Sequence, residues 1–287
     1  MTGFVHPEFL VETDWLEQNL AKPDVVVLDC TVHLMVKPNA PYDVVPARAD
    51  YEKGHVAGAQ FCDVYRDVSD TTQKYAFMRP CADAFAAAMR RFGISNTTRV
   101  ITYSTANPWW ATRVWWLLRE FGHDNAAVLN GGWQKWSRES RPTETGPSKT
   151  RAPGTFTVTA ERGLMVGKDA VQAAMGDAAI CTLNALMPAQ YAGGTYGRPG
   201  QIPGSVALPA AHLLDPATNC FLPADILRQK LGAVGAMDRP VIAYCGGGIA
   251  ASADALALIM LGHENVKIYD ASLSEWSKDS ALPMETA

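Results

Sequence analysis

The fold is decided by a short apolar segment, a glycine loop and a longer apolar segment, Val241-Ile242-Ala243-Tyr244-Cys245-Gly246-Gly247-Gly248-Ile249-Ala250-Ala251-Ser252, which continues to Leu261. The residues before the loop favour a buried strand over 241–244. The apolar run after it predicts a helix over 250–261, which ends at Gly262. A strand that leads through a loop into a helix indicates an α/β fold with a mainly parallel sheet.

The same unit occurs about 140 residues earlier in the chain, where Ser104 stands in the position of Cys245. Four pairs of segments match in the same order: 100–104 with 241–245, 121–125 with 261–265, Trp136 with Trp276, and 54–59 with 200–205. The first copy has apolar strand patterns over 25–28 and 100–103. Its helix patterns over 82–92 and 111–121 are followed by Gly93 and Gly122. The order of these matches indicates a tandem duplication of one domain.

The duplication predicts two domains joined by a linker. Residues 1–140 form the first domain and residues 156–287 the second. The segment between them, 141–155, is rich in Arg, Pro, Thr, Gly and Ser and shows little apolar periodicity, which is typical of a linker. Each domain is expected to hold a mainly parallel sheet flanked by helices.

Composition and charge exclude several classes of function. The 287 residues include 25 Lys and Arg against 29 Asp and Glu, which gives a net charge of −4, and no basic cluster predicts nucleic-acid binding. Residues 1–20 lack the apolar core of a signal peptide, and 249–261 is too short to cross a bilayer. We therefore expect a cytoplasmic protein without a membrane partner.

The six cysteines, at positions 30, 62, 81, 181, 220 and 245, do not form a C-x-x-C pair. Their spacing predicts neither a metal site nor a disulfide framework. Only Cys245 has an unusual setting, because it follows a strand and precedes three glycines and a helix. The loop Gly246, Gly247, Gly248, Ile249, Ala250 and Ala251 is expected to turn its amides inward as an anion-binding nest. With the helix N-terminus behind it, such a loop stabilises a thiolate, so Cys245 is the predicted nucleophile.

Taken in order, several motifs resemble those of tandem-domain rhodaneses, sulfurtransferases of the thiosulfate or 3-mercaptopyruvate type. They are Val27-Leu28-Asp29, Gly54-His55-Val56-Ala57-Gly58-Ala59, Phe61-Cys62-Asp63, Arg113-Val114-Trp115-Trp116, Asn130-Gly131-Gly132-Trp133, Ile202-Pro203-Gly204, and Cys245 with its glycine loop. The resemblance covers nearly the whole chain. It implies two rhodanese-like domains, the first noncatalytic and the second catalytic, with the active site between them.

The resemblance also implies a double displacement that requires no cofactor. Cys245 attacks the outer sulfur of a donor such as thiosulfate and becomes a persulfide. The persulfide then passes its sulfur to cyanide or to a thiol acceptor. We expect a monomer, since two domains that share one interface need no second copy.

The donor is less clearly indicated than the reaction. Thiosulfate-type members of the family usually carry cations in the two positions after the cysteine, where this chain has Gly246 and Gly247. Mercaptopyruvate-type members usually have glycine and then serine there, and two arginines at the positions of Leu186 and Gln190. Because a carboxylate would lack these bidentate donors, thiosulfate is the preferred prediction and 3-mercaptopyruvate the alternative.

Three further residues are candidates for the substrate pocket. Arg198 precedes the 202–204 turn and either points into the cleft or is a solvated loop arginine. Trp109 and Trp110 occupy the place where the family has a pocket-lining aromatic pair, and interdomain packing is their alternative role.

Two other functions fit parts of the pattern. A cysteine phosphatase would need an arginine after a five-residue loop, but Ala250 and Ala251 stand there. A persulfide carrier or interaction module that serves a protein acceptor stays open as a second class of function. Loss of activity on replacing Cys245 would separate an enzyme from a scaffold.

Overall fold

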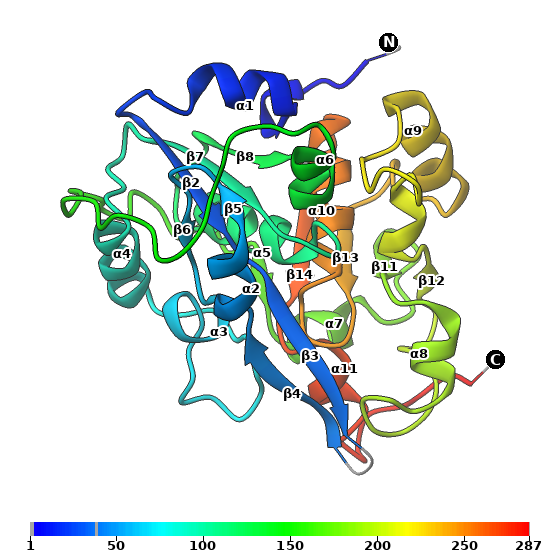
Figure 1. Cartoon of the computed structure of the whole chain (residues 1–287). Coiled ribbons are helices and arrows are strands. Elements are labelled where there is room, and N and C mark those ends of the chain that lie inside the picture. The colour runs from blue at the N-terminus through cyan, green and yellow to red at the C-terminus, as the bar shows by residue number, and fades with distance from the viewer. Residues whose placement is uncertain (1–2, 38–39, 287) are drawn as a thin grey trace.

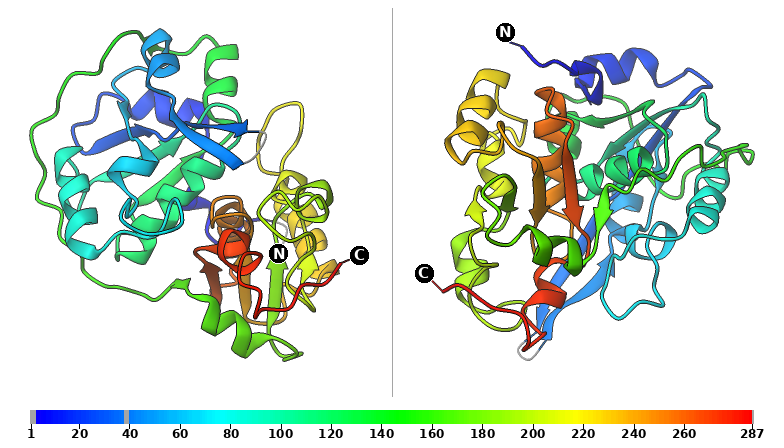
Figure 2. Two further views of the ribbon diagram at one scale, coloured as in Figure 1. Left: turned by 90° about the horizontal axis from the view of Figure 1, so that it is seen from below. Right: turned by 180° about the vertical axis from the view of Figure 1, so that it is seen from behind.

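The chain folds into two similar halves. The computed structural model describes residues 3–37 and 40–286. The first half contains η1 (Pro7–Phe9), β1 (Leu10–Val11), α1 (Thr13–Asn19), β2 (Val25–Asp29), β3 (Val32–Lys37), β4 (Ala40–Pro46), α2 (Arg48–Lys53), β5 (His55–Val56), β6 (Gln60–Phe61), α3 (Val64–Asp67), α4 (Ala82–Arg91), β7 (Arg99–Tyr103), α5 (Trp109–Glu120), β8 (Ala126–Leu129), α6 (Gly132–Arg138) and β9 (Thr143–Glu144). The second contains β10 (Met165–Val166), α7 (Lys168–Ala174), β11 (Cys181–Asn184), α8 (Pro188–Ala192), β12 (Val206–Ala207), η2 (Ala210–Leu213), α9 (Ala224–Ala233), β13 (Val241–Tyr244), α10 (Ala251–Met260), β14 (Val266–Tyr269) and α11 (Ser272–Trp276). Figure 1 and Figure 2 show them as two lobes.

Each half is built on a five-stranded parallel sheet with the same strand order. The order is β1-β8-β7-β2-β6 in the first half and β10-β14-β13-β11-β12 in the second. The central strands are buried along their length, as the apolar runs predicted. The structure thus confirms the α/β fold and the internal repeat. The predicted helices are confirmed as α4, α5 and α10, and Gly93, Gly122 and Gly262 follow them with positive φ.

The first half carries an insertion that has no counterpart among the described residues of the second. Strands β3 and β4 form an antiparallel hairpin between β2 and α2. In Figure 1 this hairpin runs diagonally across the front of the molecule toward α11. It therefore brings residues of the first half to the second, as the site requires.

The connection between the halves is more closely tied to the first half than the predicted linker implied. Within 141–155, strand β9 pairs with β5, and the amide of Gly154 donates to the carbonyl of Arg90 (2.8 Å). Beyond it, Phe156 is buried and packs edge-on against Phe85. Residues 156–164, the start of the predicted second domain, thus run along the first half before β10 begins. Figure 2 shows this segment passing around the outside of the molecule.

The halves meet through their equivalent helices, α5 and α10. Thr112 and Ser252, which occupy matching positions of the repeat, share a hydrogen bond of 2.7 Å between their hydroxyl oxygens. Beside this contact, the fully buried Arg113 donates from Nη2 to Asp270 Oδ1 (2.7 Å) and to the carbonyl of Phe77 (2.5 Å). Separating the halves or removing either partner would leave the other buried charge without compensation. The Arg113–Asp270 pair therefore favours this one arrangement of the two halves.

Helix α10 is buried on every side, and it includes an acidic residue. Asp254 has no exposed surface, and neither of its carboxyl oxygens has a hydrogen-bond partner among the described residues. Burial therefore raises the pKa of this carboxyl well above its usual value. No helix within residues 3–37 and 40–286 is long and apolar enough to span a membrane.

This carboxyl predicts a pH-dependent stability. The native state holds the Asp254 proton at pH values where the unfolded state has lost it. Stability therefore falls as pH rises from about 4 toward the raised native pKa, and the loss is complete above that pKa. We expect Asp254→Ala to be more stable than the parent by about 1–3 kcal/mol at pH 8, with a smaller gain at pH 5. Urea unfolding of the parent and the variant from pH 5 to 8 measures the gain in stability at each pH. Asp254→Asn should remove the pH slope while keeping an unpaired polar group, and equal slopes in the parent and the Ala variant would contradict this interpretation.

Candidate active site

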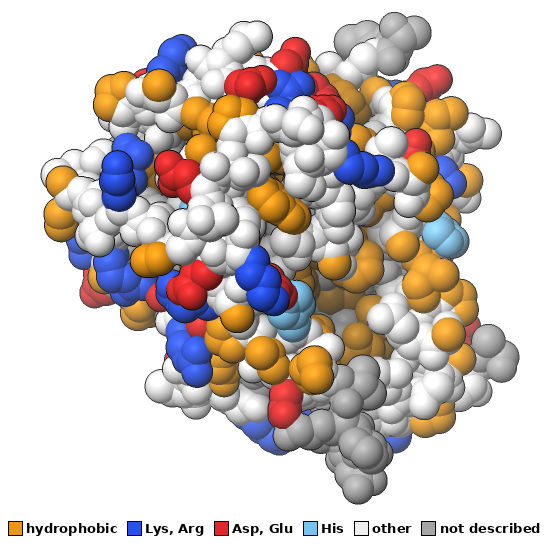
Figure 3. Space-filling model, viewed as in Figure 1, with side chains coloured by type: hydrophobic (Ala, Val, Ile, Leu, Met, Phe, Trp, Pro, Cys, Tyr) orange, Lys and Arg blue, Asp and Glu red, His pale blue; other side chains and the backbone are white. Residues whose placement is uncertain are grey.

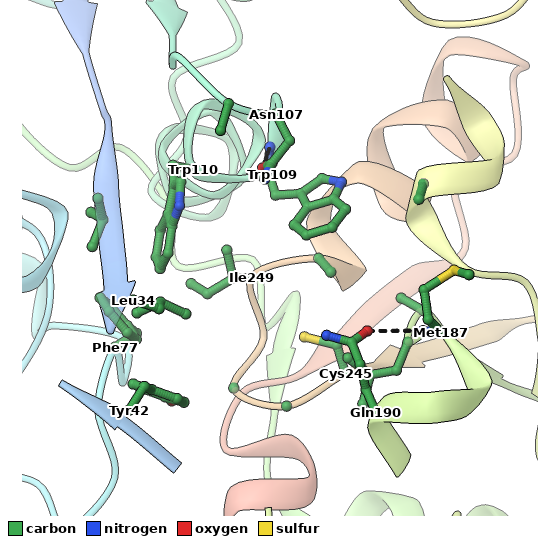
Figure 4. A pocket seen from close by; sticks show the side chains of 18 of the residues that line it. Leu34, Tyr42, Phe77, Asn107, Trp109, Trp110, Met187, Gln190, Cys245 and Ile249 are labelled. Atoms are coloured by element: carbon green, nitrogen blue, oxygen red, sulfur yellow. Dashed lines mark hydrogen bonds between the residues drawn. The ribbon is translucent and has the colours of Figure 1, made fainter. Parts of the chain in front are cut away.

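A cavity of about 400 Å³ lies between the two halves, with Cys245 on its wall. The space-filling view shows hydrophobic side chains gathered in a hollow where the halves meet (Figure 3). The close-up shows residues of the first half facing Cys245, Met187 and Gln190 of the second (Figure 4). Cys245 follows the last residue of β13 and is only 2% exposed, so a reagent reaches its sulfur from within the cavity.

The loop after Cys245 is held from behind by residues 272–274. Ser272 Oγ accepts from the amides of Cys245 and Gly248, at 3.1 Å each. The carbonyl of Cys245 accepts from the amide of Leu273 (3.1 Å), and that of Gly246 accepts from Ser274 N (2.9 Å) and Oγ (2.6 Å). Since a trans peptide places its N–H opposite its C=O, the amides of Gly246 and Gly247 point away from this segment, toward the cavity that both glycines line.

The predicted anion nest is therefore smaller than the sequence suggested. Gly246, Gly247, Ile249 and Ala250 line the cavity, and their amides have no hydrogen-bond partner among the described residues. Gly248 and Ala251 do not line it. The Gly248 amide is taken by Ser272, and Ala251 is buried in the first turn of α10. The remaining amides lie at the N-terminus of α10, a ready site for negative charge.

Two of the loop glycines are required by close neighbours. A Cβ at Gly246 would lie 2.1 Å from Cε1 of Tyr196. Gly248 has φ +72°, and a Cβ there would lie 2.7 Å from the carbonyl oxygen of Asp270. At Gly247, by contrast, the nearest atom is the Tyr42 hydroxyl at 3.7 Å. The Tyr196 ring thus occupies the space that a side chain at position 246 would need, whereas position 247 has room for a small side chain.

Two tyrosines flank Cys245, one from each half. Burial raises the pKa of Tyr196, and the charge of the Cys245 thiolate raises it further. Burial also raises the pKa of Tyr42, a residue of β4, and its hydrogen bond to Ser274 offsets part of this effect. Both phenols therefore keep their protons at neutral pH. A protonated hydroxyl beside the loop can donate to an anionic sulfur, which a phenolate could not do.

The predicted aromatic pair lies in the cavity. Trp109 and Trp110 begin α5 and both line the wall opposite Gln190, together with Phe77 (Figure 4). Trp110 also packs against Phe77, with ring centroids 4.9 Å apart. The hairpin adds Leu34 and Met35, which are 43% and 58% exposed, at the same cavity.

Arg198 is not a cavity residue, and that prediction is wrong. Its Nε donates to the carbonyl of Ser277 (3.0 Å), and its Nη2 donates to those of Asp279 (2.6 Å) and Leu282 (2.8 Å). The guanidinium thus binds backbone oxygens of the segment that follows α11. Among the described cavity-lining residues none is Lys or Arg.

Sequence reasoning missed several residues that shape the site. Tyr42, Leu34 and Met35 come from the hairpin, and the short apolar run Leu34-Met35-Val36 between His33 and Lys37 was an available strand signal. Ser272 and Ser274 follow β14 at the carboxyl edge of the sheet, where ligand-binding residues gather. Tyr196 carried no comparable signal, since only the tertiary fold brings its loop to Gly246.

Comparison with known proteins points to one family for this arrangement. The family model for the rhodanese-like domain matches twice, at residues 12–139 and 174–279. The chain is 30% identical over 306 residues to a mitochondrial thiosulfate/3-mercaptopyruvate sulfurtransferase of Arabidopsis thaliana, covering 97% of this chain and 78% of that one. It is 31% identical over 290 residues to the thiosulfate sulfurtransferase of Rattus norvegicus, covering 96% and 94%.

A solved structure shows the same architecture over nearly the whole chain. SseA from Escherichia coli, a 3-mercaptopyruvate sulfotransferase, superposes with a TM-score of 0.82 at 28% identity. The match covers 92% of this chain and 98% of that one. The similar proteins thus include both donor types, so the comparisons do not choose between thiosulfate and 3-mercaptopyruvate.

Proposed function

Because this chain belongs to the rhodanese-like family of sulfurtransferases, we propose that it transfers sulfane sulfur from thiosulfate to a thiol or to cyanide through a persulfide on Cys245. One observation carries the proposal. Cys245 opens onto the cavity between the halves, beside four unpartnered loop amides at the N-terminus of α10. Ser104, its counterpart in the first half, donates its hydroxyl to the carbonyl of Asn107, so we assign no chemistry to that half.

In the first half-reaction, the Cys245 thiolate attacks the outer sulfur of thiosulfate. A new S–S bond forms to Cys245, the S–S bond within thiosulfate breaks, and sulfite leaves with the electron pair. Total charge is conserved, and the product is the Cys245 persulfide anion. We expect the Gly246 and Gly247 amides to stabilise this anion, and the protonated hydroxyls of Tyr42 and Tyr196, which line the same cavity, support that role.

In the second half-reaction, the acceptor attacks the outer sulfur of the persulfide. The S–S bond to Cys245 breaks, and Cys245 leaves as the thiolate with which the cycle began. Cyanide leaves as thiocyanate, and a thiol leaves as its own persulfide after losing its proton to solvent. No redox partner is consumed in either step.

Thiosulfate is preferred over 3-mercaptopyruvate because the cavity offers little to a carboxylate. Leu186 lines the wall with an apolar side chain. The Gln190 side-chain oxygen accepts from the amide of Met187 (3.0 Å), so this residue offers the cavity only its neutral NH2 group (Figure 4). A carboxylate is bound best by paired cationic donors, whereas the thiosulfate outer sulfur needs access to Cys245 and the loop amides.

Intact-protein mass spectrometry after incubation with each donor tests the proposal. Thiosulfate is expected to add one sulfur atom, mapped by peptide analysis to Cys245 and removed by cyanide, and 3-mercaptopyruvate is expected to load the protein more slowly. If 3-mercaptopyruvate loads Cys245 faster, the donor assignment is wrong. If neither donor loads it, persulfide transfer from these compounds is excluded.

A further inference from the structure

We propose that the acceptor in the second half-reaction is a small thiol carrying an uncharged apolar group, aromatic or alkyl, which occupies the cavity between the halves. The proposal rests on the proposed function, because it requires the Cys245 persulfide. It follows from three features of the cavity: the absence of cationic side chains among its described residues, its aromatic walls, and the depth at which Cys245 lies.

The charge of the cavity does not suit an anionic thiol. Its described lining contains no Lys, Arg, Asp or Glu, and His33 is the single ionisable base there. His33 Nε2 lies 2.8 Å from Asp50 Oδ2, so that ring is engaged by a carboxylate outside the cavity. Arg198, the nearest candidate cation from the sequence, binds carbonyls elsewhere. Thiosulfate can place its charge against the loop amides beside Cys245. An ionised group on an acceptor that fills the rest of the cavity lies away from these amides, so it would lose its hydration without gaining a charged partner.

The walls favour an apolar group on two opposing sides. Trp109, Trp110 and Phe77 come from the first half, and Met187 faces them from the second (Figure 4). Leu186 of the second half also lines the cavity. About 400 Å³ falls within the range of pockets that bury small organic ligands, and it greatly exceeds the space that thiosulfate or cyanide needs. Flat rings and thioether chains are surfaces on which an aromatic or alkyl group packs well.

The position of Cys245 favours a small molecule over a cysteine on a folded partner. Its side chain is 2% exposed, and Tyr42 and Tyr196 stand close on either side of the loop. An acceptor sulfur must therefore enter the cavity with its carrier group. The exposed Leu34, Met35 and Met187 continue the apolar wall outward, so the carrier group meets apolar surface along its path.

The chemistry of this step balances without a further reactant. The apolar thiol, as its thiolate, attacks the outer sulfur of the Cys245 persulfide. The bond between the two persulfide sulfurs breaks, and Cys245 leaves as a thiolate. The product is the persulfide of the apolar thiol, which then departs.

Three ring thiols that differ in charge test the proposal. Cys245 is loaded with thiosulfate, and its discharge is timed by mass spectrometry with benzyl mercaptan, 4-(mercaptomethyl)benzoate and 4-(mercaptomethyl)benzylamine. Each rate is divided by the rate of the same thiol with glutathione persulfide. The neutral thiol is expected to discharge the protein at least about tenfold faster than either charged thiol, because a charged group loses its hydration in the cavity. It is expected to be about thirtyfold faster than 2-mercaptoethanol, which has no ring to bury.

A charge placed in the cavity provides the matched variant. Gln190→Arg adds a cation at the wall and is expected to raise the relative rate of the carboxylate thiol by about tenfold. Gln172→Arg makes the same replacement on the exposed surface of α7, away from the cavity. It is expected to change the rate of the carboxylate thiol relative to benzyl mercaptan by less than about twofold. Thermal unfolding and cyanide discharge show that each variant is folded and loaded.

The outcomes separate this proposal from the function on which it rests. If Cys245 is not loaded, the proposed function has failed. If Cys245 is loaded and discharged by cyanide, but the charged thiols match or exceed benzyl mercaptan, the apolar acceptor is overturned while the persulfide mechanism stands. Discharge by a folded protein thiol alone, with every small thiol slow, would overturn it equally and favour the carrier function. An unchanged ratio in Gln190→Arg would place the ring outside this cavity and overturn the proposal.

Discussion

Replacing Cys245 by serine is expected to abolish persulfide formation and to lower sulfur transfer from thiosulfate by at least about a thousandfold. The serine hydroxyl keeps its proton at neutral pH, whereas the thiolate is the attacking species in the proposed mechanism. The change is nearly isosteric, and the amide of residue 245 keeps its bond to Ser272. The loop should therefore stay folded. Mass spectrometry and thiocyanate formation measure the two losses.

The exposed Cys81 provides the control for this variant. It lies before α4, outside the cavity, and Cys81→Ser should load with sulfur as the parent does. A cyanide-removable sulfur that persists in Cys245→Ser and disappears in Cys81→Ser would move the nucleophile away from the cavity, and with it the whole mechanism.

Replacing Gly246 by alanine, which adds one methyl group, is expected to cause the second large loss of activity. The Cβ of Gly246→Ala would lie 2.1 Å from the Tyr196 ring, so either the ring or the loop must move. Overpacking of this kind costs about 1–3 kcal/mol, and a displaced loop misdirects the amides that face Cys245. We expect a fall in kcat/KM for thiosulfate of about tenfold to a hundredfold, with a lower thermal midpoint.

Gly247→Ala is the matched control, because the nearest atom to its Cβ lies at 3.7 Å. It should change kcat/KM by less than about threefold. Combining Gly246→Ala with Tyr196→Gly removes the clash and should restore part of the rate. Equal losses at both glycines would show that backbone flexibility, and not the Tyr196 ring, makes glycine necessary at position 246.

The duplicated fold explains why one cavity serves the whole chain. The equivalent helices α5 and α10 meet at Thr112 and Ser252. Since each helix follows a central strand of its half, β7 or β13, the carboxyl ends of these two strands lie at the same interface. The two halves then differ in what they supply. The second contributes Cys245 and its loop, and the first contributes the tryptophan pair and the β3–β4 hairpin. In the proposed mechanism the first half therefore serves as the cavity's other wall, and no chemistry is assigned to it.

Much of the secondary structure was predictable because it depends on local patterns. The buried strands 25–28, 100–103 and 241–244 and the helices ended by Gly93, Gly122 and Gly262 follow from apolar periodicity and the left-handed conformation that glycine tolerates. The linker was less predictable. Segment 141–164 has few apolar residues, yet β9 and Phe156 attach it to the first half through contacts with residues far away in the sequence.

The sequence by itself determined the repeated α/β fold and singled out Cys245 with its glycine loop, because strand, loop and helix are contiguous and their chemistry is local. Tertiary structure alone decided what surrounds that cysteine. Tyr196 fills the space at Gly246, Ser272 takes the amide of Gly248, and Arg198 binds carbonyls instead of a substrate. These contacts join residues 24 to 81 positions apart. Side-chain direction at such separations is set by packing between elements, which no local pattern encodes.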